Sequence, residues 1–267
     1  MKNLSKIYVF LVFAFLYAPI LLLILFSFNS ATSTSVFEGF SLKWYRVLFQ
    51  KEAVLTALGN TVLMAVVSSV ISTVLGTAAA VGIDKYKKGI AKTSVMATTN
   101  IPMMNPEIVT GISMMLLFVF FGRMLNKGNV LGFTTILIAH VTFCLPYVIL
   151  TVLPKLRQTD KNLAEAAMDL GCKPGKAFFK VVLPAITPGI ITGLIMAFTL
   201  SLDDFIITYF TSGPGFQTIP IVIYSMTKKS VKPDMYALST IIFVSILVLL
   251  ILYNFAQSKS DAKDKKK

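Results

Sequence analysis

Charged residues are scarce in this 267-residue sequence, at 14% against 55% hydrophobic residues. One histidine and two cysteines leave little material for a metal site, and Cys144 and Cys172 lack CxxC spacing. Neither a GxSxG nor an HExxH motif occurs, which argues against a hydrolase built on either motif. With a mean hydropathy of +0.77, the composition excludes an ordinary soluble domain.

The sequence also lacks a motif for binding a nucleotide. Residues 171–177 read G-C-K-P-G-K-A, one residue short of a phosphate loop, and end in Ala where Ser or Thr would bind magnesium. The net charge of +13 does not indicate nucleic-acid binding, because the basic residues lie between long apolar runs and in the C-terminal tail. We therefore expect no cofactor in this chain and no nucleic-acid partner.

Six apolar stretches are long enough to cross a bilayer, which takes about 20 residues of helix. They are residues 7–28, 56–83, 93–121, 130–153, 185–210 and 236–256. The first is longer than a signal-peptide core of about 7–15 residues, and no A-x-A site follows it, so we expect it to be retained. The sequence predicts an all-α integral membrane protein with six transmembrane helices.

The lysines and arginines predict the orientation, because basic loops stay on the cytoplasmic side. Most of the 25 basic residues fall before residue 7, at 85–92, at 155–180 and at 259–267. The alternate loops hold the smaller share, which is Lys43, Arg46, Lys51, Arg123, Lys127, Lys228, Lys229 and Lys232. Both termini are therefore expected inside (N-in/C-in).

Two spans carry small residues at every fourth position, which lets helix backbones approach closely where lipid gives no hydrophobic drive for association. The ladders are Ser68, Ser72, Gly76 and Ala80 in the second span, and Gly189, Gly193, Ala197 and Ser201 in the fifth. We interpret them as packing surfaces of a compact helix bundle.

Three acidic residues fall inside the predicted spans, where an ionised group costs several kcal/mol unless it faces a partner or water. Glu107 lies midway along the third span, and Asp203 and Asp204 lie toward the outer end of the fifth. A pathway lined by carboxylates favours a cationic substrate. Aromatic residues could add cation–π contacts of about 0.5–2 kcal/mol each; the candidates are Trp44, Tyr147 and Tyr209.

Structural explanations for the same residues stay open. Asn105 and Pro106 resemble an N-cap and a first helical position, so Glu107 could simply sit at the positive end of a broken helix. Adjacent helical residues diverge by about 100°, so only one of Asp203 and Asp204 is expected to face the path, and we favour Asp203. His140 has no second ligand at metal-binding spacing and is expected to be a packing residue.

The loop at 162–184 reads NLAEAAMDLGCKPGKAFFKVVLP. Asn162 can cap a short helix, Gly171 can end it, and Pro174 can start another. Its alanines give the first helix so little bulk that it can seat in a groove of another protein. A solvated interfacial helix is the simpler alternative.

This loop resembles the EAA loop of ABC-type importer permeases, on the strength of Glu165-Ala166-Ala167, Gly171 and Val182-Leu183-Pro184. Further stretches, at 26–30, 42–45, 105–109, 142–146, 201–204 and 223–226, are similar to the second permease of spermidine/putrescine importers. The resemblance implies a type I ABC importer permease fold. It also implies that Glu165, Ala166 and Ala167 dock on a cytoplasmic ATPase, while Gly171 permits the turn.

By the same resemblance, Trp44, Glu107 and Asp203 match positions associated with polyamine passage, and Asp204 and Tyr209 are added as path candidates. Glu107 departs from the Asp that is common at its position. The implied partners are a sister permease, an ATPase dimer that holds ATP and magnesium, an extracytoplasmic polyamine-binding protein, and lipid of the bacterial inner membrane.

We expect three parts in the chain: a first helix and outer loop at 1–55, a transmembrane core at 56–256 with its coupling loop, and a basic tail at 257–267. The chain itself is expected not to be an enzyme. Importers of other organic cations or aminoalkylphosphonates share several of these stretches and remain alternatives. A cation channel or secondary carrier, and an intramembrane enzyme using Glu107 and Asp203, are rivals from other classes.

Overall fold

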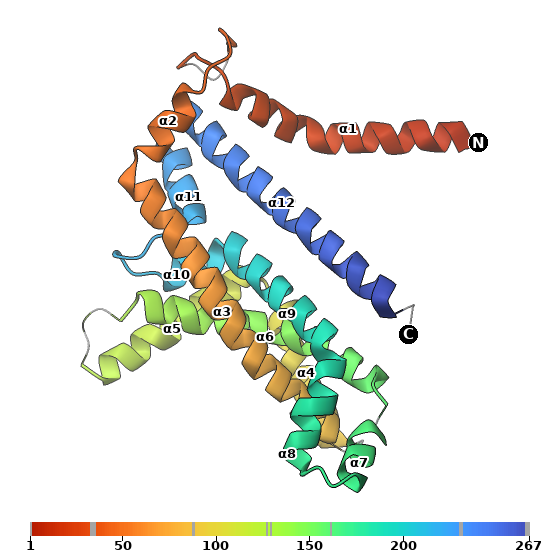
Figure 1. The fold of residues 1–267 in the computed structure, drawn as a ribbon. Helices are drawn as coiled ribbons and strands as arrows, with labels where there is room; N and C mark the ends of the chain where they lie inside the picture. Colours follow the sequence, from red (N-terminus) through yellow and green to blue (C-terminus); the bar gives the residue numbers. More distant parts are fainter. Residues whose placement is uncertain are drawn as a thin grey trace. The chain divides into compact units, whose positions relative to one another are not determined.

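The computed structural model describes residues 2–32, 36–86, 89–126, 128, 130–160, 162–229 and 232–264. The regular elements of this part of the chain are all helical, which confirms the all-α prediction. They are α1 (Lys2–Ser27), α2 (Lys43–Phe49), α3 (Glu52–Lys85), α4 (Ile90–Met104), α5 (Glu107–Met124), α6 (Phe133–Gln158), α7 (Asn162–Asp169), α8 (Pro174–Ala177), the π-helical segment η1 (Phe178–Val182), α9 (Leu183–Asp203), α10 (Ile206–Thr211), α11 (Ile219–Lys229) and α12 (Pro233–Asp264) (Figure 1).

Five helical segments are long and apolar enough to cross a membrane, by length and composition. They are Lys6–Ser27, Glu52–Lys85, Glu107–Met124, Phe133–Gln158 and Pro174–Asp203, and Pro233–Val248 is a shorter apolar segment. The predicted sixth span falls within α12, so the count of six stays a prediction. The orientation also stays a prediction, because helix length and composition do not distinguish the two sides of a membrane. Some of the lysines behind it lie outside the described residues, namely Lys87, Lys88, Lys127, Lys161 and Lys265 to Lys267.

The chain divides into two compact units. The first unit combines Met1–Leu55 with Ile223–Lys267, and the second unit is Thr56–Val222. Within the first, α12 packs against α1 and α2. Lys51, just after α2, forms an ion pair with the buried carboxylate of Asp234 in the first turn of α12. This ion pair ties the two sequence-distant segments of the first unit together.

Helix α6 is the centre of the second unit, with α3 and α9 running beside it (Figure 1). Both small-residue ladders serve this packing. A Cβ atom built on Gly76 of α3 would meet Val148 Cβ at 2.7 Å, and one built on Gly193 of α9 would meet Val148 Cγ1 at 3.2 Å. Val148 is fully buried, so it is held between two glycines. The prediction that the ladders are helix-packing surfaces is confirmed.

The third predicted span is two helices rather than one. Asn105 is extended (φ −75°, ψ 139°), as a residue before proline prefers to be, and α5 begins at Glu107. The carbonyl of Pro106 accepts hydrogen bonds from the backbone N–H groups of Val109 and Thr110. The expected helix start is therefore present, but Pro106 rather than Asn105 occupies the cap position.

The fifth predicted span is also interrupted. It runs as α9 to Asp203, is extended at Asp204 (φ −61°, ψ 124°), and resumes as α10 at Ile206. An Asp side chain can bond to nearby backbone N–H groups and so compete with helix continuation. Hydropathy does not reveal this break, because the flanking residues remain apolar.

Candidate functional site

Two carboxylates of the second unit stand at helix ends. Glu107 opens α5 and Asp203 closes α9, and both side chains are exposed. The charge of Glu107 acts on Asp203, and it also acts on the half-buried hydroxyl of Tyr147 in α6. The fold therefore places Glu107 within electrostatic reach of both Asp203 and Tyr147, and we call these three residues the acidic patch.

The two carboxylates differ in how their helices support them. Glu107 lies at the positive N-terminal end of α5, where a negative charge is stabilised by roughly 0.3–1 kcal/mol. Asp203 lies at the negative C-terminal end of α9 and also feels the charges of Asp204 and Glu107. Among the described residues, none of the ion pairs involves Glu107 or Asp203. The patch therefore carries negative charge that a cation would neutralise.

Asp204 has a different environment from its neighbour, being only 8% exposed. Its Oδ1 accepts a hydrogen bond from the Ile207 N–H (3.2 Å). Its Oδ2 accepts bonds from the Thr208 N–H and the Thr208 hydroxyl, both at 2.7 Å. The carboxylate thus binds the otherwise unpaired N–H groups in the first turn of α10, as a helix cap does.

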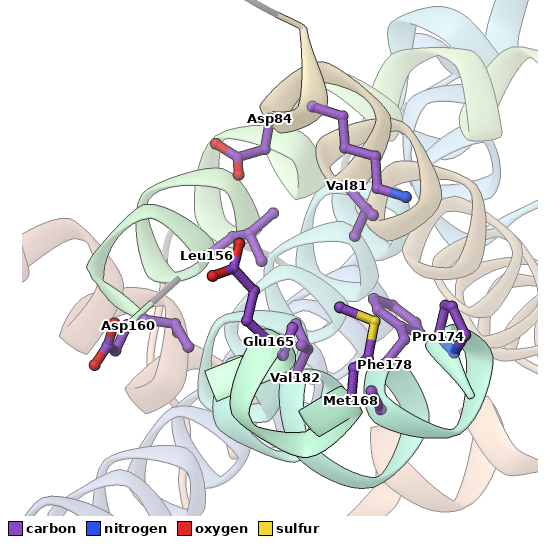
Figure 2. Close-up of a pocket in the computed structure, with 13 residues that line it drawn as sticks. Val81, Asp84, Leu156, Asp160, Glu165, Met168, Pro174, Phe178 and Val182 are labelled. Carbon is purple, nitrogen blue, oxygen red and sulfur yellow. The ribbon is translucent and has the colours of Figure 1, made fainter. Parts of the chain in front are cut away.

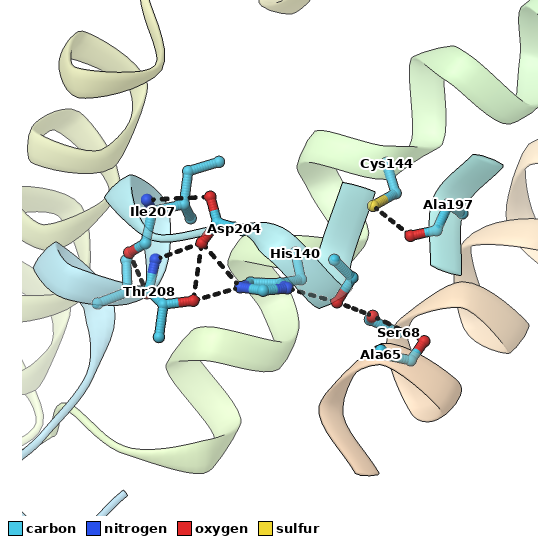
Figure 3. Close-up of polar contacts among 10 residues, drawn as sticks. Ala65, Ser68, His140, Cys144, Ala197, Asp204, Ile207 and Thr208 are labelled. Carbon is cyan, nitrogen blue, oxygen red and sulfur yellow. Dashed lines mark hydrogen bonds and ion pairs between the residues drawn. The ribbon is translucent and has the colours of Figure 1, made fainter. Parts of the chain in front are cut away.

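His140 of α6 connects this cap to the rest of the bundle (Figure 3). Its Nε2 lies 2.8 Å from Thr208 Oγ1 and 3.3 Å from Asp204 Oδ2, and its Nδ1 lies 2.7 Å from Ser201 Oγ. Ser68 of α3 donates a hydrogen bond of 2.8 Å to Ser201. The ring is 2% exposed, which confirms His140 as a buried residue with both nitrogens satisfied.

Sequence reasoning missed this network, although a signal was present. Ser68 and Ser201 are hydroxyl residues at the ends of the two small-residue ladders, and both ladders face α6. A buried hydroxyl needs a hydrogen-bond partner. The single histidine of α6 was the available partner.

The aromatic candidates Tyr209 and Trp44 belong to different units of the chain. Tyr209 of α10 is 43% exposed, and its ring lies 5.5 Å from that of Phe205. Trp44 belongs to the first unit, where its Nε1–H donates to the Asn29 carbonyl at 2.8 Å. The ammonium of Lys43 lies 5.1 Å from the centre of the Trp44 ring, so this ring already carries a cation–π contact.

The predicted loop helix is present as α7, followed by a turn at Gly171. Gly171 has φ +85°, which favours glycine, and its N–H bonds to the Met168 carbonyl at 2.9 Å. The Cys172 N–H bonds back to the Ala167 carbonyl at 3.1 Å, as in a Schellman helix end. The predictions that Gly171 ends the helix and that Pro174 begins the next are confirmed.

The start of α7 differs from the prediction. Asn162 is already within the helix, and its backbone N–H donates to Asp160 Oδ1 at 3.0 Å. Asp160 therefore supplies the side-chain bond that Asn162 was expected to make. An Asp two residues earlier fits this role because its short side chain places a carboxylate oxygen near the first N–H groups of the helix.

A groove of about 450 Å³ lies between this loop and the neighbouring ends of α3 and α6. Glu165 lines it, and in Figure 2 its side chain points from α7 toward Leu156. Ala167 is buried against the following short helices, whereas Ala166 is exposed. The three EAA residues thus face different directions: Glu165 into the groove, Ala167 inward and Ala166 outward.

The sequence matches one family over most of its length. The family described as "Binding-protein-dependent transport system inner membrane component" matches residues 72–263. The chain belongs to this family, so it is a multi-pass inner-membrane permease of the type I ABC importer class.

Two polyamine permeases are similar in sequence to most of this chain. The chain is 39% identical over 249 residues to the putrescine transport system permease protein PotI of Escherichia coli K12, covering 92% of this chain and 89% of the relative. It is 38% identical over 257 residues to the spermidine/putrescine transport system permease protein PotC of the same strain, covering 96% and 92%. The chain is therefore closely related to polyamine permeases.

Solved structures agree on the fold. A bacterial ABC transporter that imports the acidic polysaccharide alginate matches with a TM-score of 0.72 at 16% identity, covering 94% of this chain and 91% of that chain. The same transporter in complex with its alginate pentasaccharide-bound periplasmic protein matches with a TM-score of 0.71, covering 94% and 90%. At this identity the likeness concerns the fold alone.

Proposed function

We propose that this chain is one permease subunit of an ATP-driven importer for polyamines such as spermidine and putrescine. It pairs with a sister permease, a cytoplasmic ATPase dimer that holds ATP and magnesium, and an extracytoplasmic polyamine-binding protein. Six N-in/C-in helices, with a core at 56–256 and a basic cytoplasmic tail at 257–267, belong to the same proposal.

The acidic patch is the observation that carries the substrate assignment. Polyamines are chains of protonated amines joined by apolar methylenes, so they need spaced carboxylates and apolar or aromatic walls. Glu107 and Asp203 are two exposed carboxylates that interact electrostatically, and Tyr147, within reach of the Glu107 charge, adds an aromatic ring. The names of PotI and PotC support the same substrate class.

Of the two adjacent aspartates, we assign Asp203 to the path. Asp204 is buried and uses both carboxylate oxygens to hold α10, whereas Asp203 is exposed. Tyr209 and Trp44 are proposed as aromatic contacts of the substrate, because both present partly exposed rings.

The EAA loop is proposed as the coupling element. Exposed Ala166 offers a low-bulk surface to a cleft of the ATPase, and Ala167 holds α7 against the short helices that lead into α9. Gly171 sets the angle between the two parts of the loop. Glu165 lines the groove beneath the loop, where it can bind a basic group of the docked ATPase.

The test is polyamine uptake per assembled transporter in cells that lack this gene, with this chain supplied beside its partner subunits. Asp203→Asn is expected to lower spermidine or putrescine uptake about tenfold or more, because a hydrogen bond to a charged group is worth about 1.5–3 kcal/mol. Co-purification of the ATPase is expected to stay unchanged. Glu52→Gln removes an exposed carboxylate from the first turn of α3 and serves as the matched control.

Contrary outcomes separate the parts of the proposal. Equal uptake by the parent and Asp203→Asn would remove Asp203 from the path. Normal assembly without polyamine uptake would move the substrate to another organic cation or an aminoalkylphosphonate. Uptake that persists without the ATPase would instead favour a channel or secondary carrier.

A further inference from the structure

We propose that the buried His140 is a positioning residue that fixes the carboxylate of Asp203 for the passing cation. The inference rests on the proposed function. It concerns a residue that contacts no substrate and acts through the break between α9 and α10.

The hydroxyl protons define the direction of the network. Thr208 has one hydroxyl proton, which it donates to Asp204 Oδ2 at 2.7 Å. Thr208 Oγ1 must therefore accept from His140 Nε2, which makes Nε2 the protonated nitrogen of the ring. In the neutral ring Nδ1 is then an acceptor, and the Ser201 hydroxyl 2.7 Å away is its donor.

A directed chain of hydrogen bonds follows from these assignments. It runs from the Ser68 hydroxyl to Ser201, then to His140, then to Thr208, and ends on the Asp204 carboxylate. Each group donates to the next, and successive bonds in such a chain polarise one another toward the charged end. Its members come from α3, α6, α9, α10 and the break between the last two, and Figure 3 labels Ser68, His140, Asp204 and Thr208.

Asp203 lies between the two points that this chain holds. Ser201, two residues before it, is fixed to α3 and α6, and Asp204, immediately after it, is fixed to α10. The backbone on both sides of Asp203 is thus immobilised, although its own carboxylate is exposed. His140 is the link that joins these two anchors, since its two nitrogens bind one on each side of the break.

Positioning matters because Asp203 lies at the C-terminal end of α9, where the helix dipole destabilises a negative charge. An acidic side chain at the C-terminal end of a helix, beside two other carboxylates, is repelled from its place. Without a fixed backbone the break could relax and move the carboxylate away from Glu107. The buried network opposes that movement.

The experiment is a double-mutant cycle on polyamine uptake by the complete transporter, measured per assembled complex. His140→Leu is expected to lower uptake about tenfold in the Asp203 parent, with ATPase co-purification retained, and to cause no further loss in an Asp203→Asn background. Thr208→Val is the second variant. It removes the hydroxyl that bridges His140 and Asp204, leaving only their direct 3.3 Å contact, but keeps the side-chain shape and both backbone bonds to Asp204.

Cys144→Ala is the matched control, because Cys144 also joins α6 to α9 through a bond to the Ala197 carbonyl but lies outside the chain of hydroxyls (Figure 3). It is expected to keep parental uptake. Equal losses from His140→Leu with and without the Asp203 carboxylate would overturn the inference, as would parental uptake by both His140→Leu and Thr208→Val. A parent complex that takes up no polyamine would refute the proposed substrate first and this inference with it.

Discussion

Val148 gives a quantitative test of how tightly the bundle is packed. A methyl group added at Gly76 would bring two Cβ atoms within 2.7 Å, well inside the roughly 3.5–4.0 Å of normal carbon contact. A Cβ atom cannot rotate away, and Val148 has Gly193 of α9 on its other side. Helices α3 and α6 must therefore separate by about 1 Å to accommodate Gly76→Ala.

The magnitude follows from comparison with a glycine of the same helix. A Cβ atom at Gly82 meets nothing within 4 Å, so Gly82→Ala carries the general effect of glycine-to-alanine exchange in α3 without a clash. Overpacking typically costs about 1–3 kcal/mol, so Gly76→Ala should be about 2 kcal/mol less stable than Gly82→Ala. For a protein of this size, that lowers Tm by roughly 4–8 °C.

Thermal unfolding of the purified complex in detergent measures the difference. Both variants are compared with the parent under one detergent condition, and the quantity of interest is the Tm of Gly76→Ala minus that of Gly82→Ala. Equal Tm values for the two variants would refute the close approach of α3 to Val148. A lower Tm for Gly82→Ala than for the parent would contradict the open surroundings of Gly82.

Two further predictions concern the coupling loop and the first unit. Gly171→Ala places a side chain at φ +85°, which costs about 1–2 kcal/mol. It should weaken ATPase retention in pull-down assays. Gly175→Ala should not, because Gly175 has open space around it and no positive φ. Equal retention by the two variants would refute the role of the turn at Gly171. Lys51→Met leaves the 2%-exposed carboxylate of Asp234 unpaired. It should cost about 2–3 kcal/mol in thermal unfolding, less than the full 3–5 because Lys51 is 38% exposed, and Lys51→Met with Asp234→Asn should recover most of the loss.

The sequence predicted those features that depend on spacing along one helix. The two ladders and the turn at Gly171 follow from local rules, because a small side chain or a left-handed backbone needs no knowledge of the partner. The break after Asp203 could not be predicted in this way. It depends on which backbone N–H groups lack partners, and on a histidine 64 residues away in the chain.

For the same reason, the acidic patch could be predicted only in part from the sequence. Glu107 and Asp203 could be selected as charges within apolar runs, but their meeting depends on how α5 and α9 end in space. Two neighbouring aspartates look alike in a sequence. Burial and hydrogen bonding separate them, with Asp204 capping α10 and Asp203 left exposed.

If helix α9 turned about Ser201 as a rigid rod, its two arms would be very unequal. It is held at Ser201 by α3 and α6, about 3 Å along the helix from Asp203 and about 27 Å from Leu183, where the loop helices join it. For a rigid helix turning about Ser201, a movement of about 5 Å at the loop end becomes about 0.5 Å at Asp203. Under the function proposed above, a large displacement at the coupling loop would therefore reach the Asp203 carboxylate only as a small one.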